Sequence, residues 1–257
     1  MNYDIIDDGS FKYIETNPGK EDTLLLLHGL FGALSNFQGI ISHFGEQRNV
    51  IVPILPIFEL PLRKATLEGL LNYVLDFAKE KGLKKVDVLG NSLGGHIALL
   101  FVLANPELVR STILTGSSGL FESAMGSTFP KRGNYEFIKT KTESTFFDPK
   151  VATKELVDEV FDIVNDRNKA LKIITTAKSA IRHNLEDKLA DITCPTLLIW
   201  GQDDTITPPF VGEKFHELIS DSQLVLVDKC GHAPMMEHPE HFNSVLQQFL
   251  NKLSVTA

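Results

Sequence analysis

The five residues Gly90–Gly94, with the sequence GNSLG, constrain the fold of this 257-residue chain more than any other feature. They directly follow the apolar run 86–89 and directly precede residues 95–101, whose composition favours a helix. A sharp turn between a strand and a helix strains the backbone of its central residue, and the residues two positions on either side must lack a Cβ. The two glycines meet that requirement. The segment therefore predicts a strand, a tight turn and a helix, with Ser92 at the carboxyl end of the strand.

The same pattern, Gly-x-Ser-x-Gly between strand and helix, is typical of a serine that acts as a nucleophile. The N-terminus of the following helix would direct backbone N–H groups and the positive end of its dipole at negative charge formed there. A pentapeptide with three fixed positions also fits an ordinary turn, so the interpretation depends on further residues in the expected chain order.

A glycine-containing segment, His28–Gly32, follows the apolar run 23–27 and can form a loop at the same edge of the sheet as Ser92. A backbone N–H from Leu30, with that of Phe31 as the alternative, would combine with the N–H of Leu93 into an oxyanion hole with two donors. The simpler interpretation is a glycine turn that leads into a helix near residues 33–41.

An acid and a histidine follow in order. The buried run 195–200 ends in Gly201, Gln202, Asp203 and Asp204, and His232 follows another strand-like run at 223–227. Either acid could orient an imidazole, and the order serine, acid, histidine is that of the expected catalytic group. Helical chain is expected from residue 207, where Thr207 can cap and the prolines fit the first turn.

The other histidines suggest no second site. His28 is expected to support the oxyanion loop, and His96 lies one turn into the helix after Ser92. His238 and His241 stand with Glu237 and Glu240 at the start of the last helix, where a solvated face is favoured over a metal site. We therefore predict no metal. The remaining histidines without an assigned partner are His43, His183 and His216.

At these residues the chain resembles the α/β-hydrolase-fold serine hydrolases. GNSLGG at 90–95, WGQDD at 200–204 and CGHAP at 230–234 are in the style of bacterial members, which are similar to both carboxylesterases and meta-cleavage-product hydrolases. The resemblance implies a doubly wound, mostly parallel eight-stranded sheet, a helical cap inserted after the sixth strand, and no cofactor. It also favours Asp204 over Asp203, because related hydrolases place their acid deeper in the loop.

The strand and helix pattern divides the chain into three parts. Strands alternate with helical stretches from about 20 to 115 and again from 195 onward, which predicts βαβ units in one parallel sheet. Between them helical periodicity dominates, in 154–165 and 167–181. We expect core at 1–119, a helical cap or lid at 120–188 over the ligand-binding edge of the sheet, and core again at 189–257.

The expected activity is hydrolysis of a carboxylic ester of a small, largely apolar substrate through an acyl-enzyme. His232 would accept the proton of Ser92, while Asp204 holds the imidazole tautomer. A serine at 92 argues against haloalkane dehalogenases and epoxide hydrolases, which resemble this fold but use aspartate.

Two alternatives stay open. Asn91 before the nucleophile is what carbon–carbon bond hydrolases of 2-hydroxy-6-oxo-dienoates show. Those enzymes generally carry a glycine-richer oxyanion segment and a tryptophan after the histidine, whereas this chain has Leu30-Phe31 and Ala233. The other alternative is a ligand receptor on the same fold that does not turn over.

The expected pocket is apolar. Arg132, Arg167 and Arg182 are candidates for holding a substrate carboxylate, although an ordinary salt bridge is favoured for each. The residues predicted to line the substrate pocket are Phe31, Asn91, Phe121, Met125 and Phe137.

Composition limits the partners. A formal charge of −8 makes nucleic acid a poor partner, and a small molecule is expected instead. Cys194 and Cys230 are the only two cysteines and are expected to be free thiols. The N-terminus is acidic and no stretch is apolar enough to span a bilayer, so we expect a cytoplasmic monomer or homodimer without membrane attachment.

Overall fold

The computed structural model describes residues 3–32, 37–121 and 132–256, with side chains to residue 253. Its sheet has eight strands in the order β1-β2-β4-β3-β5-β6-β7-β8. β1 pairs with β2 and β2 with β4 in antiparallel fashion, and every other neighbouring pair is parallel. This confirms the predicted fold class. The strands are β1 (Ile6–Asp7), β2 (Lys12–Glu15), β3 (Thr23–Leu27), β4 (Asn49–Pro53), β5 (Val86–Asn91), β6 (Val109–Thr115), β7 (Thr196–Gly201) and β8 (Ser222–Val227).

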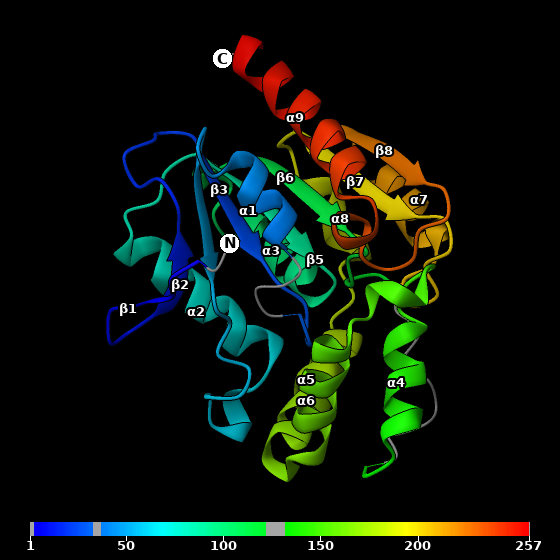
Figure 1. Cartoon of the computed structure of the whole chain (residues 1–257). Helices are drawn as coiled ribbons and strands as arrows, with labels where there is room; N and C mark the ends of the chain where they lie inside the picture. Colours follow the sequence, from blue (N-terminus) through cyan, green and yellow to red (C-terminus); the bar gives the residue numbers. More distant parts are fainter. Residues whose placement is uncertain (1–2, 33–36, 122–131, 257) are drawn as a thin grey trace.

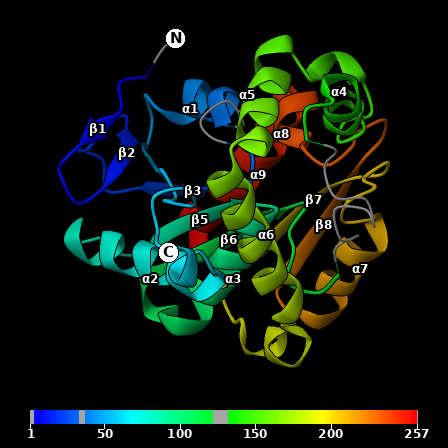
Figure 2. The same ribbon diagram turned by 90° about the horizontal axis from the view of Figure 1, so that it is seen from below.

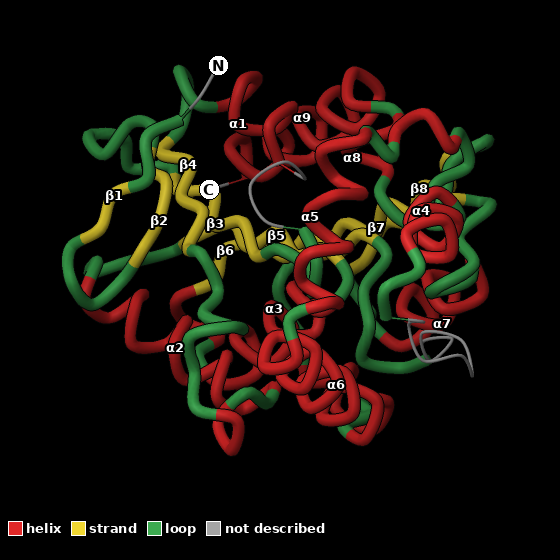
Figure 3. Tube along the Cα trace, turned by 60° about the horizontal axis from the view of Figure 1, so that its bottom comes forward, coloured by secondary structure: helices red, strands yellow, loops and turns green. Residues whose placement is uncertain are grey.

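Helices cover both faces of this sheet (Figure 3). The α-helices are α1 (Gln38–Phe44), α2 (Leu67–Glu80), α3 (Leu93–Ala104), α4 (Tyr135–Glu143), α5 (Lys154–Asn165), α6 (Arg167–Arg182), α7 (Pro209–Leu218), α8 (Pro234–Glu237) and α9 (Pro239–Thr256). Short 3-10 helices lie at Leu62–Lys64, Pro106–Leu108, Pro149–Val151 and Glu186–Asp191.

The central strands read as continuous apolar runs because both of their faces are buried. All five residues of β3 are buried, and alternate side chains enter opposite cores. Leu25 and Leu27 join the core formed with α2, α3 and α7. Leu24 and Leu26 join the core formed with α1, α8 and α9. The molecule therefore has three layers, with the sheet in the middle.

Three helices, α4, α5 and α6, are inserted between β6 and β7 and project from one edge of the sheet (Figure 1). Figure 2 views the molecule from this side, with α5 and α6 in front of the middle of the sheet. The two chain connections of this helical insertion lie side by side, since Leu185 N donates to Gly119 O at 2.8 Å and Asn184 Nδ2 to Leu120 O at 2.9 Å. The insertion follows the sixth strand, as predicted for the fold class.

Local sequence explains the helices of the insertion. Thr153 caps α5 by accepting from Leu156 N. Asp166, the single residue between α5 and α6, accepts from two backbone N–H groups of the first turn of α6 and so starts a new helix. α6 also contacts the core, because Thr176 Oγ1 donates to Ala65 O at 2.9 Å, just before α2.

Candidate active site

Ser92 occupies the turn between β5 and α3 with φ 55° and ψ −120°, a positive-φ backbone conformation that residues other than glycine rarely adopt. The turn is so tight that a Cβ at Gly90 would lie 2.3 Å from Gly94 O, and a Cβ at Gly94 would lie 1.9 Å from Leu27 O. Glycine is therefore required at both positions. The backbone packing explains the pattern from which the turn was predicted.

Hydrogen bonds hold this turn against β6. Ser92 N donates to Thr115 O at 3.2 Å, and Ser92 O accepts from Ser118 N at 3.2 Å. Ser92 lines a cavity, and its hydroxyl makes no hydrogen bond to another described residue. Catalytic hydrogen bonds often tighten only once substrate is bound. The serine is thus rigidly placed by its backbone, with its side chain left available.

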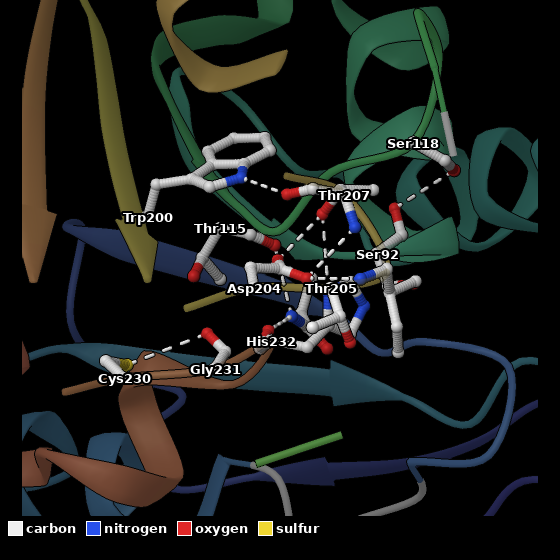
Figure 4. A network of polar contacts seen from close by, with 12 residues as sticks. Ser92, Thr115, Ser118, Trp200, Asp204, Thr205, Thr207, Cys230, Gly231 and His232 are labelled. Atoms are coloured by element: carbon white, nitrogen blue, oxygen red, sulfur yellow. Dashed lines mark hydrogen bonds and ion pairs between the residues drawn. The ribbon is translucent and has the colours of Figure 1, made fainter. Parts of the chain in front are cut away.

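His232 and Asp204 meet beside this turn (Figure 4). His232 Nδ1 donates to Asp204 Oδ2 at 2.8 Å, and both side chains are buried. Asp204 Oδ1 accepts from Ile206 N at 2.8 Å and Thr207 N at 2.9 Å. Because Nδ1 is taken by the carboxylate, Nε2 is the ring nitrogen left to exchange a proton.

Of the two neighbouring acids, the structure places Asp204 against the histidine and leaves the Asp203 side chain exposed. Among the described residues, Asp203 makes its hydrogen bond through the backbone, with Asp203 N donating to Cys230 O at 2.8 Å. Asp204 is 3% exposed, so its carboxylate is hydrogen-bonded to the histidine, a hydroxyl and backbone N–H groups in place of water.

Thr207 is a member of this network that sequence reasoning assigned elsewhere. It was expected to cap the next helix, but α7 begins at Pro209 and its N-cap residue is Pro208, with no side-chain cap. The Thr207 hydroxyl instead donates to Asp204 Oδ2 at 2.9 Å, and its carbonyl accepts from Trp200 Nε1 at 2.7 Å. The capping prediction was wrong because the nearby buried carboxylate offers the hydroxyl a stronger acceptor.

Leu30 and Leu93, the expected oxyanion donors, both line the cavity, and Leu93 is the first residue of α3. His28 supports the loop as expected. Leu55 N donates to His28 Nε2 at 3.0 Å, so Nδ1 carries the proton and donates to Gly29 O at 2.8 Å. Burial lowers the pKa of His28, which keeps the ring in this neutral form.

The cavity has a volume of about 480 Å³, within the range of small-molecule sites. Of the predicted pocket residues, Phe31, Asn91 and Phe137 line it. Phe121 is not among its described lining residues: its ring packs on Phe210 with centroids 5.4 Å apart and is about half exposed. Met125 lies outside the described residues.

Asn91 has a second role besides lining the cavity. Its Nδ2 donates to Thr115 O at 3.1 Å and, at 3.4 Å, to the backbone carbonyl of His232. The residue before the nucleophile thus joins the serine turn to the histidine loop.

The three arginines considered for a substrate carboxylate are exposed, and none is among the described residues that line the cavity. Arg132 donates to Asn165 O at 2.8 Å. Lys141, on α4, does line the cavity, with its ammonium 6.0 Å from the centroid of the Phe137 ring. Sequence reasoning missed Lys141 because nothing in the pattern of α4 shows which of its lysines faces the cavity.

In the part of the chain that the structure describes, no three His, Cys, Asp or Glu side chains lie close enough together to hold a metal ion. No described helix is both long and apolar enough to cross a bilayer.

Comparison with known proteins agrees with this geometry. The family model of the α/β-hydrolase fold matches residues 22–239. The chain belongs to the α/β-hydrolase family. It is an enzyme of the hydrolase class by that membership, and the eight-stranded sheet and the serine turn are the corresponding structural features.

Relatives within the family differ in the reaction that their names give. A 2-hydroxy-6-oxononadienedioate/2-hydroxy-6-oxononatrienedioate hydrolase of Cupriavidus pinatubonensis is 31% identical over 202 residues, covering 73% of this chain and 68% of the relative. The crystal structure of MGS-MChE2, an α/β hydrolase from the metagenome of lagoon sediments at Mar Chica, Morocco, is 40% identical with a TM-score of 0.79, covering 97% of this chain and 98% of that one. A membrane phospholipase A, described as a bacterial virulence factor, is 25% identical with a TM-score of 0.84, covering 98% and 86%.

Proposed function

We propose that this α/β hydrolase cleaves a carbon–carbon bond next to a ketone in a 2-hydroxy-6-oxo-dienoate, with Ser92 as nucleophile. The observation that carries the nucleophilic chemistry is the buried contact of 2.8 Å between His232 Nδ1 and Asp204 Oδ2 beside the cavity that Ser92 lines. The similarity to the Cupriavidus hydrolase supports the choice of bond. It reverses the order expected from the sequence, which put the ester first.

In the proposed mechanism, His232 Nε2 accepts the Ser92 proton as the hydroxyl oxygen attacks the 6-oxo carbon. Asp204 stabilises the imidazolium that forms. The Leu30 and Leu93 N–H groups donate to the oxyanion, and each such donor is worth about 2.7–4 kcal/mol in other enzymes.

Collapse of this intermediate breaks the bond between carbons 5 and 6. When the substrate is in its 2-oxo tautomer, the electron pair of that bond delocalises through the conjugated chain to the 2-oxygen, which takes the proton from His232. This first product, which contains carbons 1 to 5, leaves as an acid. Water, activated by the same imidazole, then hydrolyses the ester on Ser92 and releases the second product, the acid that contains carbon 6.

The cavity fits such a substrate in charge and polarity. Aliphatic side chains from α5 and α6, including Leu156, Val160 and Ile181, form one wall and suit a hydrocarbon body. Lys141 is the one lysine or arginine among the described lining residues and suits a carboxylate.

Hydrolysis of a carboxylic ester is the second candidate. Ala233 after the histidine, in place of the tryptophan expected of carbon–carbon bond hydrolases, and the similarity to a phospholipase A both favour it.

The test is turnover of 2-hydroxy-6-oxonona-2,4-dienedioate, followed by loss of its yellow absorbance, beside p-nitrophenyl acetate and butyrate. We expect multiple turnovers of the dienedioate at a kcat/KM above that of either ester, and no turnover by Ser92→Ala. Fast ester hydrolysis with an unbleached dienedioate would transfer the proposal to the second candidate. Tight binding without turnover of any of the three would indicate a receptor.

A further inference from the structure

The loop that carries His232 is in direct backbone contact with the residues that follow α4. His232 N donates to Thr145 O at 2.9 Å. A Cβ at Gly231 would lie 2.6 Å from the same Thr145 oxygen and 2.9 Å from Phe146 Cα. We call residues 144–148 the insertion segment. It lines the cavity through Ser144, Thr145 and Phe146, so a substrate in the cavity would contact the same stretch of chain as the histidine loop.

Glu237, the last residue of α8, reaches both of these backbones with one carboxylate. Its Oε1 accepts from Gly231 N at 2.7 Å, in the histidine loop. Its Oε2 accepts from Phe147 N at 2.8 Å and from Asp148 N at 3.3 Å, in the insertion segment. The expectation of a solvated helix face at Glu237 is therefore wrong, because the carboxylate serves three backbone donors.

These three contacts differ from an ordinary surface salt bridge. Hydrogen bonds from backbone N–H groups to an ionised carboxylate are shorter and stronger than neutral ones. No lysine or arginine of the described residues pairs with Glu237 in an ion pair, so its charge is met by backbone donors. The neighbouring Cys230 thiol is buried, and burial together with the charge of Glu237 raises its pKa, which keeps it neutral.

We propose that Glu237 is a positioning residue that locks the His232 loop to the insertion segment, so that the imidazole and one wall of the substrate cavity move as a unit. The proposal rests on the proposed function in one respect, since it takes His232 as the base for Ser92. Glu237 itself is not among the lining residues and acts through the two backbones that it joins.

The experiment compares the wild-type protein with Glu237→Ala, Glu237→Gln and Glu240→Gln. The last is a matched control, because Glu240 is an exposed acid three residues further on. Hydrogen exchange of peptides covering 144–148 and 230–232 reports directly on the backbone N–H groups that Glu237 binds. The rate at which a fluorophosphonate labels Ser92 reports whether the imidazole is still placed to activate the serine hydroxyl. Because this probe is small, its binding depends little on the cavity wall that the insertion segment forms.

We expect Glu237→Ala to speed exchange in both peptides together and to slow labelling about tenfold, which corresponds to about 1.4 kcal/mol of transition-state stabilisation. Glu237→Gln keeps one acceptor oxygen but turns an NH₂ group toward the other backbone. It should therefore speed hydrogen exchange in only one of the two peptides, and it should slow labelling less than Glu237→Ala does. It carries the test if the alanine variant does not fold. Glu240→Gln should match the wild type in both measurements.

Exchange at the wild-type rate in both peptides of the Glu237 variants would overturn the proposal, and so would faster exchange with wild-type labelling. Failure of the proposed function has a different signature. In that case the dienedioate would stay unbleached in the wild-type protein, while the exchange and labelling results for the Glu237 variants would stand unchanged.

Discussion

The site depends on side chains whose charges are satisfied inside the protein. Asp204 is buried yet keeps four partners, the His232 ring, the Thr207 hydroxyl and two backbone N–H groups. A buried carboxylate with this many donors holds its position, and the imidazole is fixed through it. At this scale, neighbouring residues of the same type differ sharply in function.

The two adjacent acids give the first prediction. Asp204→Asn should lower kcat about 10³–10⁴-fold, because an amide can present a donor to Nδ1 and favour the wrong tautomer. Asp203→Asn should stay within about twofold of the wild type, since its side chain is exposed and its backbone contact is unchanged. Steady-state kinetics on the preferred substrate of the panel decides it, and equal losses would contradict the geometry.

Lys141 gives a prediction about specificity. Lys141→Met should raise KM for the dienedioate about tenfold or more, because a hydrogen bond to a charged group is lost. It should leave kcat/KM for p-nitrophenyl acetate within about twofold. The control is Lys139→Met on the same helix, where the lysine pairs with Glu143 and does not line the cavity. The same loss for both substrates would remove Lys141 from carboxylate binding.

At the scale of elements, β5 is anchored at its start by a buried ion network and ends in the serine turn. Asp87 is fully buried and accepts from Arg110, from Ser111 Oγ at 2.6 Å and from Arg48 Nη1 at 3.4 Å. Arg110 also pairs with Asp22, just before β3. The network ties the starts of neighbouring strands whose other ends carry the site.

Removing one partner from this network should be costly. Asp87→Ala leaves Arg48 and Arg110 without their buried carboxylate, and we expect a loss of about 3–5 kcal/mol in the free energy of unfolding. Urea denaturation monitored by Trp200 fluorescence measures it. The folded fraction should retain its kcat, since Asp87 lies near the start of β5 and Ser92 follows its end. A lowered kcat with an unchanged free energy of unfolding would contradict a purely stabilising role for Asp87.

At the scale of the whole molecule, the sequence was most informative where backbone sterics leave few choices. Gly90 and Gly94 could be assigned from their spacing because a Cβ at either collides with backbone. The resemblance to the family implied a mostly parallel sheet of eight strands, which the structure has. Glu237 and Thr207 could not be assigned, because each makes its contacts with residues elsewhere in the fold or across a loop. Lys141 could not be assigned, because the cavity that it lines is formed only when separate segments come together. Sequence periodicity carries no signal for such contacts.

Two buried histidines predict how stability depends on pH. Burial, and secondarily the nearby His183, lowers the pKa of His96 to about 3, and burial lowers that of His28. Each folded-state pKa lies below the unfolded value, so below about pH 6.5 the unfolded chain binds more protons. The free energy of unfolding should fall as pH drops from 7 toward 5, by up to about 1.4 kcal/mol per pH unit for His96, and His28 should add to the fall in the same direction.

Urea denaturation at pH 5, 6 and 7 tests this dependence. His96→Leu should reduce the slope of the free energy of unfolding against pH by the contribution of His96. A slope unchanged by that substitution would mean that His96 is protonated in the folded protein.

The central claim is that Ser92, activated by His232 and Asp204, is the nucleophile. The most direct measurement is to label the wild-type protein with a fluorophosphonate and locate the adduct by mass spectrometry of its peptides. The account predicts one adduct, on Ser92, that disappears in Ser92→Ala and forms at least about a hundredfold more slowly in His232→Ala. An adduct on another residue, or labelling of Ser92 at the wild-type rate without His232, would contradict it.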